Sequence, residues 1–552
     1  MALPRFRLSH AAASAFSLAL PLAATLAPCD ASSQDVLTYH NDTYRTGWFS
    51  SETTLTPANV NPGSFGLLTT VTLDGRVDAE PLVAFGQPID GQGTHDVVYV
   101  ATEGDTVFAL DAESGATLWS RNFGTPVPYQ YKDGDDNVYP VMGILSTPAI
   151  DRTRGVLYVV ADTYVSGGDI FTLHAIALNN GSDAVTPQTI TATERLQNGS
   201  TWTLQPQHQL QRPALLEANN SIYLGFGSTG DTQPQISRGT MLRYDAATLA
   251  PLDAILTDTS VENLFSPFYL SSIWQSGFGP ASDERGDVYF STGNSNWQTP
   301  SYEKHVNYPD SVLRVTPDLS RLLQSFTPSD YFSLDQGDVD LGSGGTLVVP
   351  PLNGQNAHFV VAGGKDGRVW LLDADKMGGY HAHQDRVLDV ESMGSCWCGP
   401  AYYVGPGGLP FVVTGGGNGV TTWQVQTSPP KLIQTGSTGS SNVNGLPDYG
   451  GTLPVVSSNG TKAGTAVVWY VQRPATSEDY NPGTPLTLWA YDPTNLGTPL
   501  FSAQAGTWTH AVNSNADLVP TVAGGRVYVA SNEQLQIFGL LSEKARHDGV
   551  RR

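Results

Sequence analysis

The sequence predicts an all-β protein, an eight-bladed β-propeller built from four-stranded antiparallel blades. The stretch Val97 to Trp119, VVYVATEGDTVFALDAESGATLW, holds three short runs of residues that favour β-strands. Gly104 and Gly115 stand in the turns between these runs, where a tight hairpin needs a positive φ. No run has the length of an ordinary helix, and the same pattern returns along the chain. Short strands, tight turns and repetition together predict the propeller.

Each repeat begins with a short strand that carries a proline, and a second strand rich in Val and aromatic residues follows. The eight prolines are Pro81, Pro148, Pro213, Pro280, Pro350, Pro400, Pro454 and Pro520. The second strands read VVYVA, VLYVVA, SIYLGFG, DVYFSTG, HFVVAGG, PFVVTGGG, AVVWYV and RVYVAS. A spacing of about 60 residues without a helix signal fits propeller blades with decorated loops rather than a helical solenoid.

Units of this size cannot bury their apolar faces alone, so they must pack against one another. The last unit, which ends QLQIFGLL, lacks an outer strand. We therefore expect Gly66 to Leu73 to pair with Gln534 to Leu540 and close the ring, because closure removes exposed sheet edges. Two β-sandwiches are the alternative architecture, although no linker-like change in composition divides the chain.

The N-terminus has the pattern of an export signal. Arg5 and Arg7 precede the apolar stretch Ala11 to Leu26, and small residues stand before Ser32. Lipoprotein processing at Cys29 is the alternative. No other apolar stretch reaches the roughly 18 residues of a membrane span, so we expect a periplasmic or secreted protein. The expected segments are a signal peptide (1–31), an N-terminal lead (32–65), the propeller (66–541) and a disordered C-terminal tail (542–552).

The net charge and the cysteine content exclude several classes of function. The formal net charge of −23 argues against binding to nucleic acid, because like charges repel. Export leaves two cysteines, Cys396 and Cys398, which we expect to be disulfide-bonded or buried. The sequence has no second cysteine motif for a zinc site and no CxxCH motif for a covalently bound c-type haem.

Several motifs carry a resemblance to a known superfamily. They are the ALDAESGATLW repeat, YHND…RTG, LTPANVNPGSFG, DLGSGG, AGGKDGRVWLLD and VYVAS…IFGLL. The chain resembles the quinoprotein alcohol dehydrogenase-like propellers, which carry pyrroloquinoline-quinone-type repeats, over nearly the whole mature sequence. That superfamily contains both quinone-dependent dehydrogenases and propellers without catalytic activity, so the resemblance implies the fold and leaves two functions open.

The resemblance also implies a site, in which pyrroloquinoline quinone lies beside Ca²⁺ or a similar hard cation. The loops GSTGD, VYFSTGNSNW and GGKDGRVWLLD match those of blades three, four and five. The implied metal ligands are Asp231 and Asn294, the implied catalytic bases are Asp338 and Asp340, and the implied cofactor contacts are Lys365, Trp274 and Ser228. Asp330 is a further candidate for the base. The adjacent cysteine pair that covers the quinone in many alcohol dehydrogenases is absent.

Two functions of different class follow. The first is an exported oxidoreductase that oxidises a hydroxyl of an alcohol, a sugar or a polymer. The second is a non-catalytic propeller that binds a protein or a glycan. The Gly-rich turns around Asp231, Asn294 and Lys365 allow a purely structural interpretation, because Asp and Asn favour such turns for local hydrogen bonds. In either case we expect a monomer without a membrane span.

Overall fold

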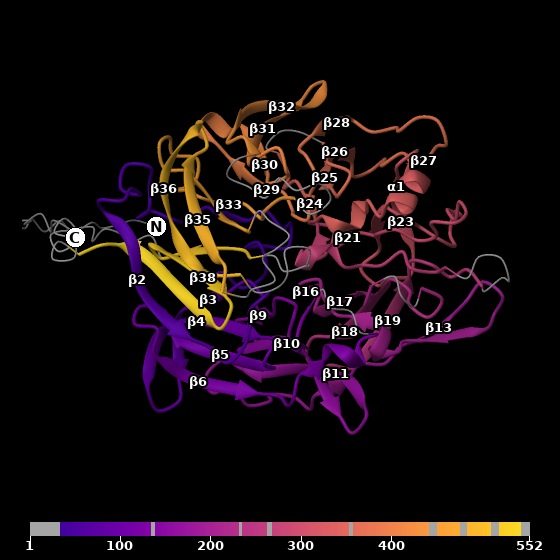
Figure 1. Cartoon of the computed structure of the whole chain (residues 1–552), viewed down its shortest axis with the longest axis horizontal. Helices are drawn as coiled ribbons and strands as arrows, with labels where there is room; N and C mark the ends of the chain where they lie inside the picture. Colours follow the sequence, from indigo (N-terminus) through magenta and orange to yellow (C-terminus); the bar gives the residue numbers. More distant parts are fainter. Residues whose placement is uncertain are drawn as a thin grey trace, which may run out of the picture. The chain divides into compact units, whose positions relative to one another are not determined.

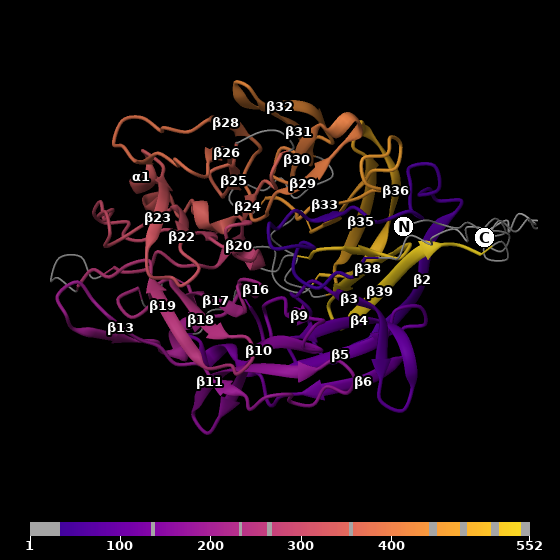
Figure 2. The ribbon, with the colours of Figure 1, turned by 180° about the vertical axis from the view of Figure 1, so that it is seen from behind.

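The computed structural model describes residues 34–133, 138–230, 234–261, 268–352, 357–440, 450–474, 483–508 and 518–542, and the following description concerns these residues. Their strands form eight main sheets, which follow one another in chain order around a ring (Figures 1 and 2). The predicted eight-bladed propeller is therefore confirmed, and the sandwich alternative is wrong. In the first seven blades the four main strands follow the chain from the innermost to the outermost and pair antiparallel, whereas the outermost strand of the eighth blade comes from the N-terminal part of the chain. Additional strands at the edges of the fourth and seventh blades pair parallel with their neighbours.

The first four blades share this order with small additions. Blade 1 consists of β3 (Leu82–Ile89), β4 (Gly93–Thr102), β5 (Thr106–Asp111) and β6 (Thr117–Asn122). Blade 2 consists of β9 (Ala149–Asp151), β10 (Val156–Val165), β11 (Gly168–Ala177) and β12 (Gln188–Thr189). Blade 3 consists of β16 (Leu216–Ala218), β17 (Ser221–Ser228), β18 (Thr240–Asp245) and β19 (Pro251–Leu256), and β15 (Gln209–Leu210) also pairs with β17. Blade 4 consists of β20 (Ala281–Ser282), β21 (Val288–Ser291), β22 (Val312–Val315) and β23 (Leu322–Thr327), with β27 (Gly379–Tyr380) at its edge.

The other four blades complete the ring. Blade 5 consists of β24 (Thr346–Val348), β25 (Phe359–Gly363), β26 (Arg368–Asp373) and β28 (Asp389–Ser392). Blade 6 consists of β29 (Ala401–Val404), β30 (Pro410–Thr414), β31 (Thr421–Thr427) and β32 (Pro430–Ser437). Blade 7 consists of β33 (Val455–Ser457), β34 (Val467–Gln472), β35 (Pro485–Asp492) and β36 (Asn495–Thr507), with β1 (Trp48–Phe49) beside β33. Blade 8 consists of β37 (Thr521–Ala523), β38 (Arg526–Ser531), β39 (Gln534–Leu540) and β2 (Phe65–Thr72).

Short elements outside the blades lie in the loops. Two small hairpins join β7 (Val127–Pro128) to β8 (Val141–Met142) and β13 (Thr193–Arg195) to β14 (Thr201–Thr203). The 3₁₀ turns are η1 (Tyr129–Tyr131), η2 (Pro206–His208), η3 (Gln275–Gly277), η4 (Leu341–Ser343) and η5 (Pro406–Gly408). No helix was predicted, yet the described residues include one α-helix, α1 (Tyr331–Gly337). None of the helices in the described part of the chain is long and apolar enough to cross a membrane.

The ring closes as predicted. Strand β2 is antiparallel to β39, with Phe65 opposite Leu540 and Thr72 opposite Gln534. An N-terminal strand thus supplies the outer strand that the last repeat lacks, and closure joins the two ends of the ring by backbone hydrogen bonds.

The repeated prolines have a structural reason. Most of them immediately precede the innermost strand of a blade, as Pro81 precedes β3 and Pro520 precedes β37. Proline lacks an N–H group and is tolerated at a strand's start, where no ladder bond is lost. Pro350 is different, because it follows β24 instead of preceding it.

The ALDAESGATLW motif joins neighbouring blades. Asp111 Oδ1 accepts a hydrogen bond from the Ser114 N–H (2.8 Å), and Gly115 takes a φ of +74° in the resulting turn. The Trp119 indole N–H then donates to the Leu178 carbonyl of blade 2 (3.0 Å). The motif therefore shapes the turn and anchors one blade to the next.

Residues 36–52 of the N-terminal lead lie inside the ring. We call residues 36–52 the central segment, because this segment bonds to every blade in turn. Its hydrogen bonds join Val36 to Val83 (blade 1), Leu37 to Ile150 (blade 2), Arg45 to Leu215 (blade 3), Thr43 to Ser282 (blade 4), Tyr44 to Val348 (blade 5), Thr46 to Tyr402 (blade 6), Gly47 to Val456 (blade 7) and Glu52 to Gly525 (blade 8). The YHND…RTG motif thus belongs to the central segment, which holds the blades together by hydrogen bonds at the axis of the ring.

Candidate functional site

One end of the ring gathers the residues that the resemblance singled out. Asn294 follows β21, the second strand of blade 4, and Lys365 follows β25, the second strand of blade 5. Asp338 and Asp340 lie in the connection from blade 4 to blade 5, and Trp274 lies in the connection from blade 3 to blade 4. Because successive strands alternate in direction, loops after second strands and connections between blades open at the same end. We call this end the site face.

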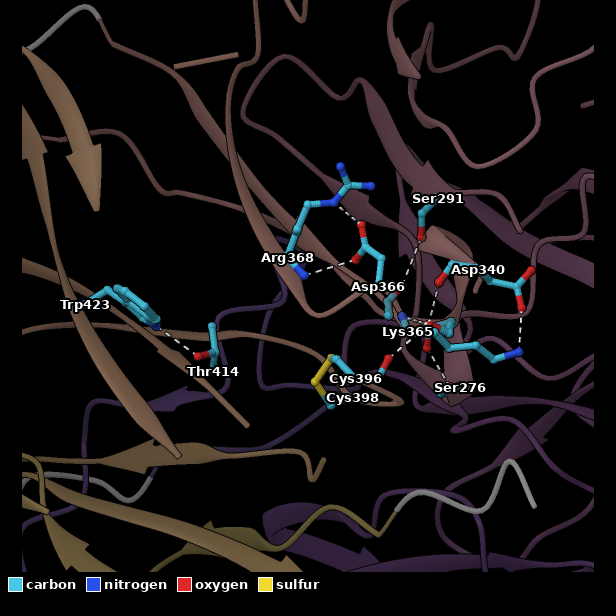
Figure 3. The surroundings of a disulfide bond; sticks show 12 residues. Ser276, Ser291, Asp340, Lys365, Asp366, Arg368, Cys396, Cys398, Thr414 and Trp423 are labelled. Atoms are coloured by element: carbon cyan, nitrogen blue, oxygen red, sulfur yellow. Dashed lines mark hydrogen bonds and ion pairs between the residues drawn. A yellow bond between two sulfur atoms is a disulfide. The ribbon is translucent and has the colours of Figure 1, made fainter. Parts of the chain in front are cut away.

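Lys365 is the centre of the cluster. Its ammonium donates to Asp340 Oδ2 (2.8 Å; Figure 3). It also donates to Asp338 Oδ1 (3.1 Å) and to the Asp338 carbonyl (3.1 Å). An ammonium group has three N–H donors, so all of them are engaged. The Lys365 side chain is 6% exposed and that of Asp340 is 4% exposed, whereas that of Asp338 is 67% exposed. One partner of the buried ammonium therefore faces solvent.

Asn294 joins the same network. Its backbone N–H donates to Asp340 Oδ1 (2.6 Å), and its side-chain amide donates to Asp338 Oδ1 (3.0 Å). The preceding Gly293 of the STGN motif is required, since a Cβ there would lie 2.8 Å from Asp340 Oδ1 and 3.0 Å from Trp274 Nε1. The blade-four loop is thus shaped to hold Asp340 and Asp338 together.

Opposing effects set the charges of these groups. Burial lowers the pKa of Lys365, but the charges of Asp340 and Asp338 outweigh it and raise that pKa above its ordinary value. Desolvation, followed by the charge of Asp340, raises the pKa of Asp338, and Lys365 counteracts part of the shift. When both carboxylates are ionised, they and the ammonium together carry one excess negative charge.

More carboxylates lie behind the cluster. Asp310 accepts the Leu341 N–H (2.9 Å), and Asp335 of α1 accepts the Ser295 N–H (2.6 Å). Burial, and then the charges of Asp335 and Asp340, raise the pKa of Asp310 well above its ordinary value. These acids hold the backbone of the two loops in place.

The site contains a further aromatic residue, Trp397, that was not predicted from the sequence. Its ring contacts that of Trp274 edge to face, with centroids 5.7 Å apart. The Lys365 ammonium lies 5.7 Å from the Trp274 ring and 5.4 Å from the Trp397 ring, within the range of cation–π attraction. The SCWCGP motif was considered only for its cysteines, although its tryptophan was the available signal.

The two cysteines on either side of Trp397 form a disulfide. Cys396 and Cys398 are each 1% exposed, which confirms the prediction of a bonded or buried pair (Figure 3). Ser343 links this loop to the site, because its hydroxyl contacts the Cys396 carbonyl (2.9 Å) and accepts the Lys365 N–H (2.8 Å). The disulfide thus lies in the wall that supports Lys365.

Two candidate residues, Ser228 and Asp330, lie outside the Lys365 cluster. Ser228, at the end of β17, contacts Ser272 (3.1 Å between hydroxyl oxygens), two positions before Trp274. Asp330 pairs with Arg368 (3.0 Å) and takes no part in the Lys365 cluster. Asp231 lies outside the described residues, so its role as a metal ligand stays a prediction. No group of three acidic, His or Cys side chains suited to a metal ion occurs within the described ranges.

Comparison with known proteins identifies the fold. No family model matches the sequence, and no curated protein matches it either. Among solved structures, a quinohemoprotein alcohol dehydrogenase from Comamonas testosteroni is similar over 92% of this chain and 80% of its own (TM-score 0.58, 14% identity). A europium-containing methanol dehydrogenase is similar over 92% of this chain and 98% of its own (TM-score 0.58, 13% identity).

A third similar structure is the quinohemoprotein alcohol dehydrogenase ADHIIG from Pseudomonas putida HK5. It matches 92% of this chain and 80% of its own, with a TM-score of 0.51 and 14% identity. At such low identities the structural similarity establishes the fold alone, so the chemistry has to be inferred from the residues of the site. These similarities confirm the predicted propeller fold.

Proposed function

We propose that this chain is an exported quinoprotein-like oxidoreductase that oxidises a hydroxyl group of an alcohol, a sugar or a polymer. The observation that carries the proposal is the cluster of Asn294, Asp338, Asp340, Lys365 and Trp274 at one end of the ring. These residues come from separate loops, and the resemblance had assigned each of them to one cofactor site. The similar dehydrogenase structures support the same class of reaction.

The side chains around Lys365 suit pyrroloquinoline quinone, a flat anionic molecule. Trp274 is half-buried and offers indole surface, and Trp397 packs against it. The Lys365 ammonium supplies positive charge beside both rings. When bound, the quinone supplies a two-electron acceptor. Trp274, supported by the buried Trp397, would contact its ring system, and Lys365 would face one of its oxygens.

At least one hydrogen bond of the Lys365 ammonium must break before it can contact a quinone oxygen, because all three of its N–H donors are engaged. Asp340 is buried on one side of the ammonium, so its bond is the harder to break. The side chain of Asp338 is largely exposed and can turn toward solvent at little cost. Movement of Asp338 would free one donor of Lys365 for a ligand oxygen.

A hard cation such as Ca²⁺ also belongs to the proposal. Carboxylate and amide oxygens are its preferred ligands, and Asn294 provides an amide oxygen beside the carboxylates of the cluster. The excess negative charge of the cluster favours a cation over an additional anion. Asp231 is the predicted carboxylate ligand. Asn294 and Asp231 would hold the ion, which would also compensate the negative charge of the quinone.

Asp338 is the better candidate for the base that takes the hydroxyl proton. A general base needs access to substrate and a pKa near the working pH. Asp338 is exposed and its pKa is raised, whereas Asp340 is enclosed by Asn294 and Lys365. Asp340 therefore positions the loops, and Asp338 accepts the proton.

Calorimetry tests the proposal directly. The purified protein is titrated with pyrroloquinoline quinone with and without Ca²⁺, and dye-linked oxidation of primary alcohols is then measured. We expect binding that strengthens with Ca²⁺ and weakens at least tenfold in Asn294→Ala. Asn495→Ala, an exposed amide at the opposite end of the ring, is the matched control. Absence of quinone binding under every metal condition would refute the proposal.

A further inference from the structure

The exposed aromatic side chains of this protein are unevenly distributed. Among the described residues, the aromatic side chains that stand out as exposed are Tyr131 (42%), Tyr139 (52%) and Trp297 (51%). Tyr131 and Tyr139 lie in the connection from blade 1 to blade 2, and Trp297 follows the second strand of blade 4. All three are therefore on the site face.

Each exposed ring is supported by a second ring. Tyr139 packs edge to face on Tyr129, with centroids 5.0 Å apart, and Tyr131 packs on Tyr164 of β10 at 4.6 Å. Trp297, three positions after Asn294, packs edge to face on Phe268 at 5.8 Å. Such support fixes the orientation of a ring that solvent would otherwise leave free to rotate, so these rings are presented to solvent in a defined way.

Exposed aliphatic side chains lie mostly elsewhere. Most of them belong to outermost strands, as Leu252 does in β19, and Leu409 lies in a turn at the opposite end of the ring. Val165 is the exception, since it adjoins the tyrosines. A protein interface usually has a contiguous apolar centre, and the site face presents separate rings instead.

We infer that the site face binds a neutral polysaccharide, whose sugar rings stack on these aromatic side chains. The C–H faces of a pyranose ring pack against an aromatic plane, and tyrosine hydroxyls can hydrogen-bond to sugar hydroxyls. The net charge of −23 disfavours a polyanionic glycan. The ligand is longer than one sugar, because blade 3 lies between the tyrosine pairs and Trp297.

If the site face binds a polysaccharide, the substrate of the proposed oxidation is a hydroxyl group of that polymer. Only this oxidation rests on the proposed function. Binding itself needs neither quinone nor metal. A protein that retains polysaccharide and fails to bind quinone would refute the proposed function and leave this inference standing.

Affinity gel electrophoresis without cofactor tests the inference. Soluble neutral polysaccharides (hydroxyethylcellulose, dextran and amylose) and anionic polygalacturonate are cast into native gels. We expect retardation by at least one neutral polymer and none by polygalacturonate. Tyr131→Ala, Tyr139→Ala and Trp297→Ala should each weaken binding several-fold, and the triple variant should lose it.

Matched variants control for loss of exposed apolar surface. Leu252→Ala and Leu409→Ala remove side chains that are 44% and 45% exposed, away from the site face, and should bind like the unaltered protein. Thermal unfolding checks that every variant is folded. The inference is overturned if no neutral polymer is bound, if polygalacturonate binds more tightly, if the aromatic variants behave like the leucine variants, or if only free monosaccharides bind in solution.

Discussion

Two buried lysines of this propeller each bridge two aspartates, but their surroundings differ. Lys132 lies between Asp162 (2.8 Å) and Asp169 (2.5 Å), and all three side chains are at most 5% exposed. Its ammonium also donates to the Pro206 and Gln209 carbonyls. Lys365 has a similar pair of carboxylates, yet its partner Asp338 is 67% exposed.

The difference separates a structural group from a candidate site. Around Lys132 every partner is enclosed, so no ligand can replace one without unfolding the loops. Around Lys365 one partner can exchange protein contacts for water, and two tryptophans lie beside the ammonium. A buried charge alone therefore does not indicate a functional site. A buried charge with a solvent-accessible partner, such as Lys365 with Asp338, does.

Replacing Lys132, whose partners are all enclosed, should have the largest effect on stability. Lys132→Met leaves Asp162 and Asp169 buried without a counter-charge, and loss of one partner from a buried pair costs about 3–5 kcal/mol. We expect the free energy of unfolding, measured by urea denaturation, to fall by that amount. A loss below about 1 kcal/mol would show that water already reaches this triad.

The enclosed triad should also give a pH dependence of stability. Burial raises the pKa of Asp162 from 3.8 to about 7, in spite of the opposing charge of Lys132. The folded protein then binds this proton more tightly than the unfolded chain does. Its contribution to stability is complete below pH 3.8 and is lost as pH rises toward 7, with a slope of at most about 1.4 kcal/mol per pH unit. Asp162→Asn should flatten this part of the profile, and an unchanged slope would contradict the assignment.

Replacing the open lysine should cost less stability. In Lys365→Met only Asp340 stays buried without its counter-charge, because Asp338 becomes solvated, so we expect a loss of about 2 kcal/mol. Urea denaturation of this variant beside Lys132→Met gives the comparison. Equal losses would show that Asp338 is held as firmly as Asp162.

Asp338→Asn should have the smallest effect on stability, within about 0.5 kcal/mol, since the residue is exposed and an amide keeps its size. Dye-linked alcohol oxidation should nonetheless fall at least a hundredfold, because the amide cannot take the hydroxyl proton. Full activity in this variant would assign the base to another residue.

The repeats made the ring predictable, since each blade carries the same proline, strand and turn signals. The central segment could not be predicted, because most of its bonds join residues 36–52 to strands far along the chain, as Gly47 to Val456, and no periodic pattern marks them. The loops after β21 and β25 were recognised from STGN and GGKDG. Trp397 was not predicted because the connection from blade 5 to blade 6, in which it lies, carries no repeated pattern. The contacts of Lys132 with Asp162 and Asp169 were not predicted either, because they join residues that are distant in the sequence.

The most direct test of the account is the dissociation constant of pyrroloquinoline quinone for Lys365→Met. Calorimetry is carried out at a temperature where the variant is folded, with Lys376→Met, an exposed lysine in a turn at the opposite end of blade 5, as control. We expect at least tenfold weaker binding for Lys365→Met and no change for Lys376→Met. Equal affinities of the unaltered protein and Lys365→Met would contradict a role of Lys365 in quinone binding.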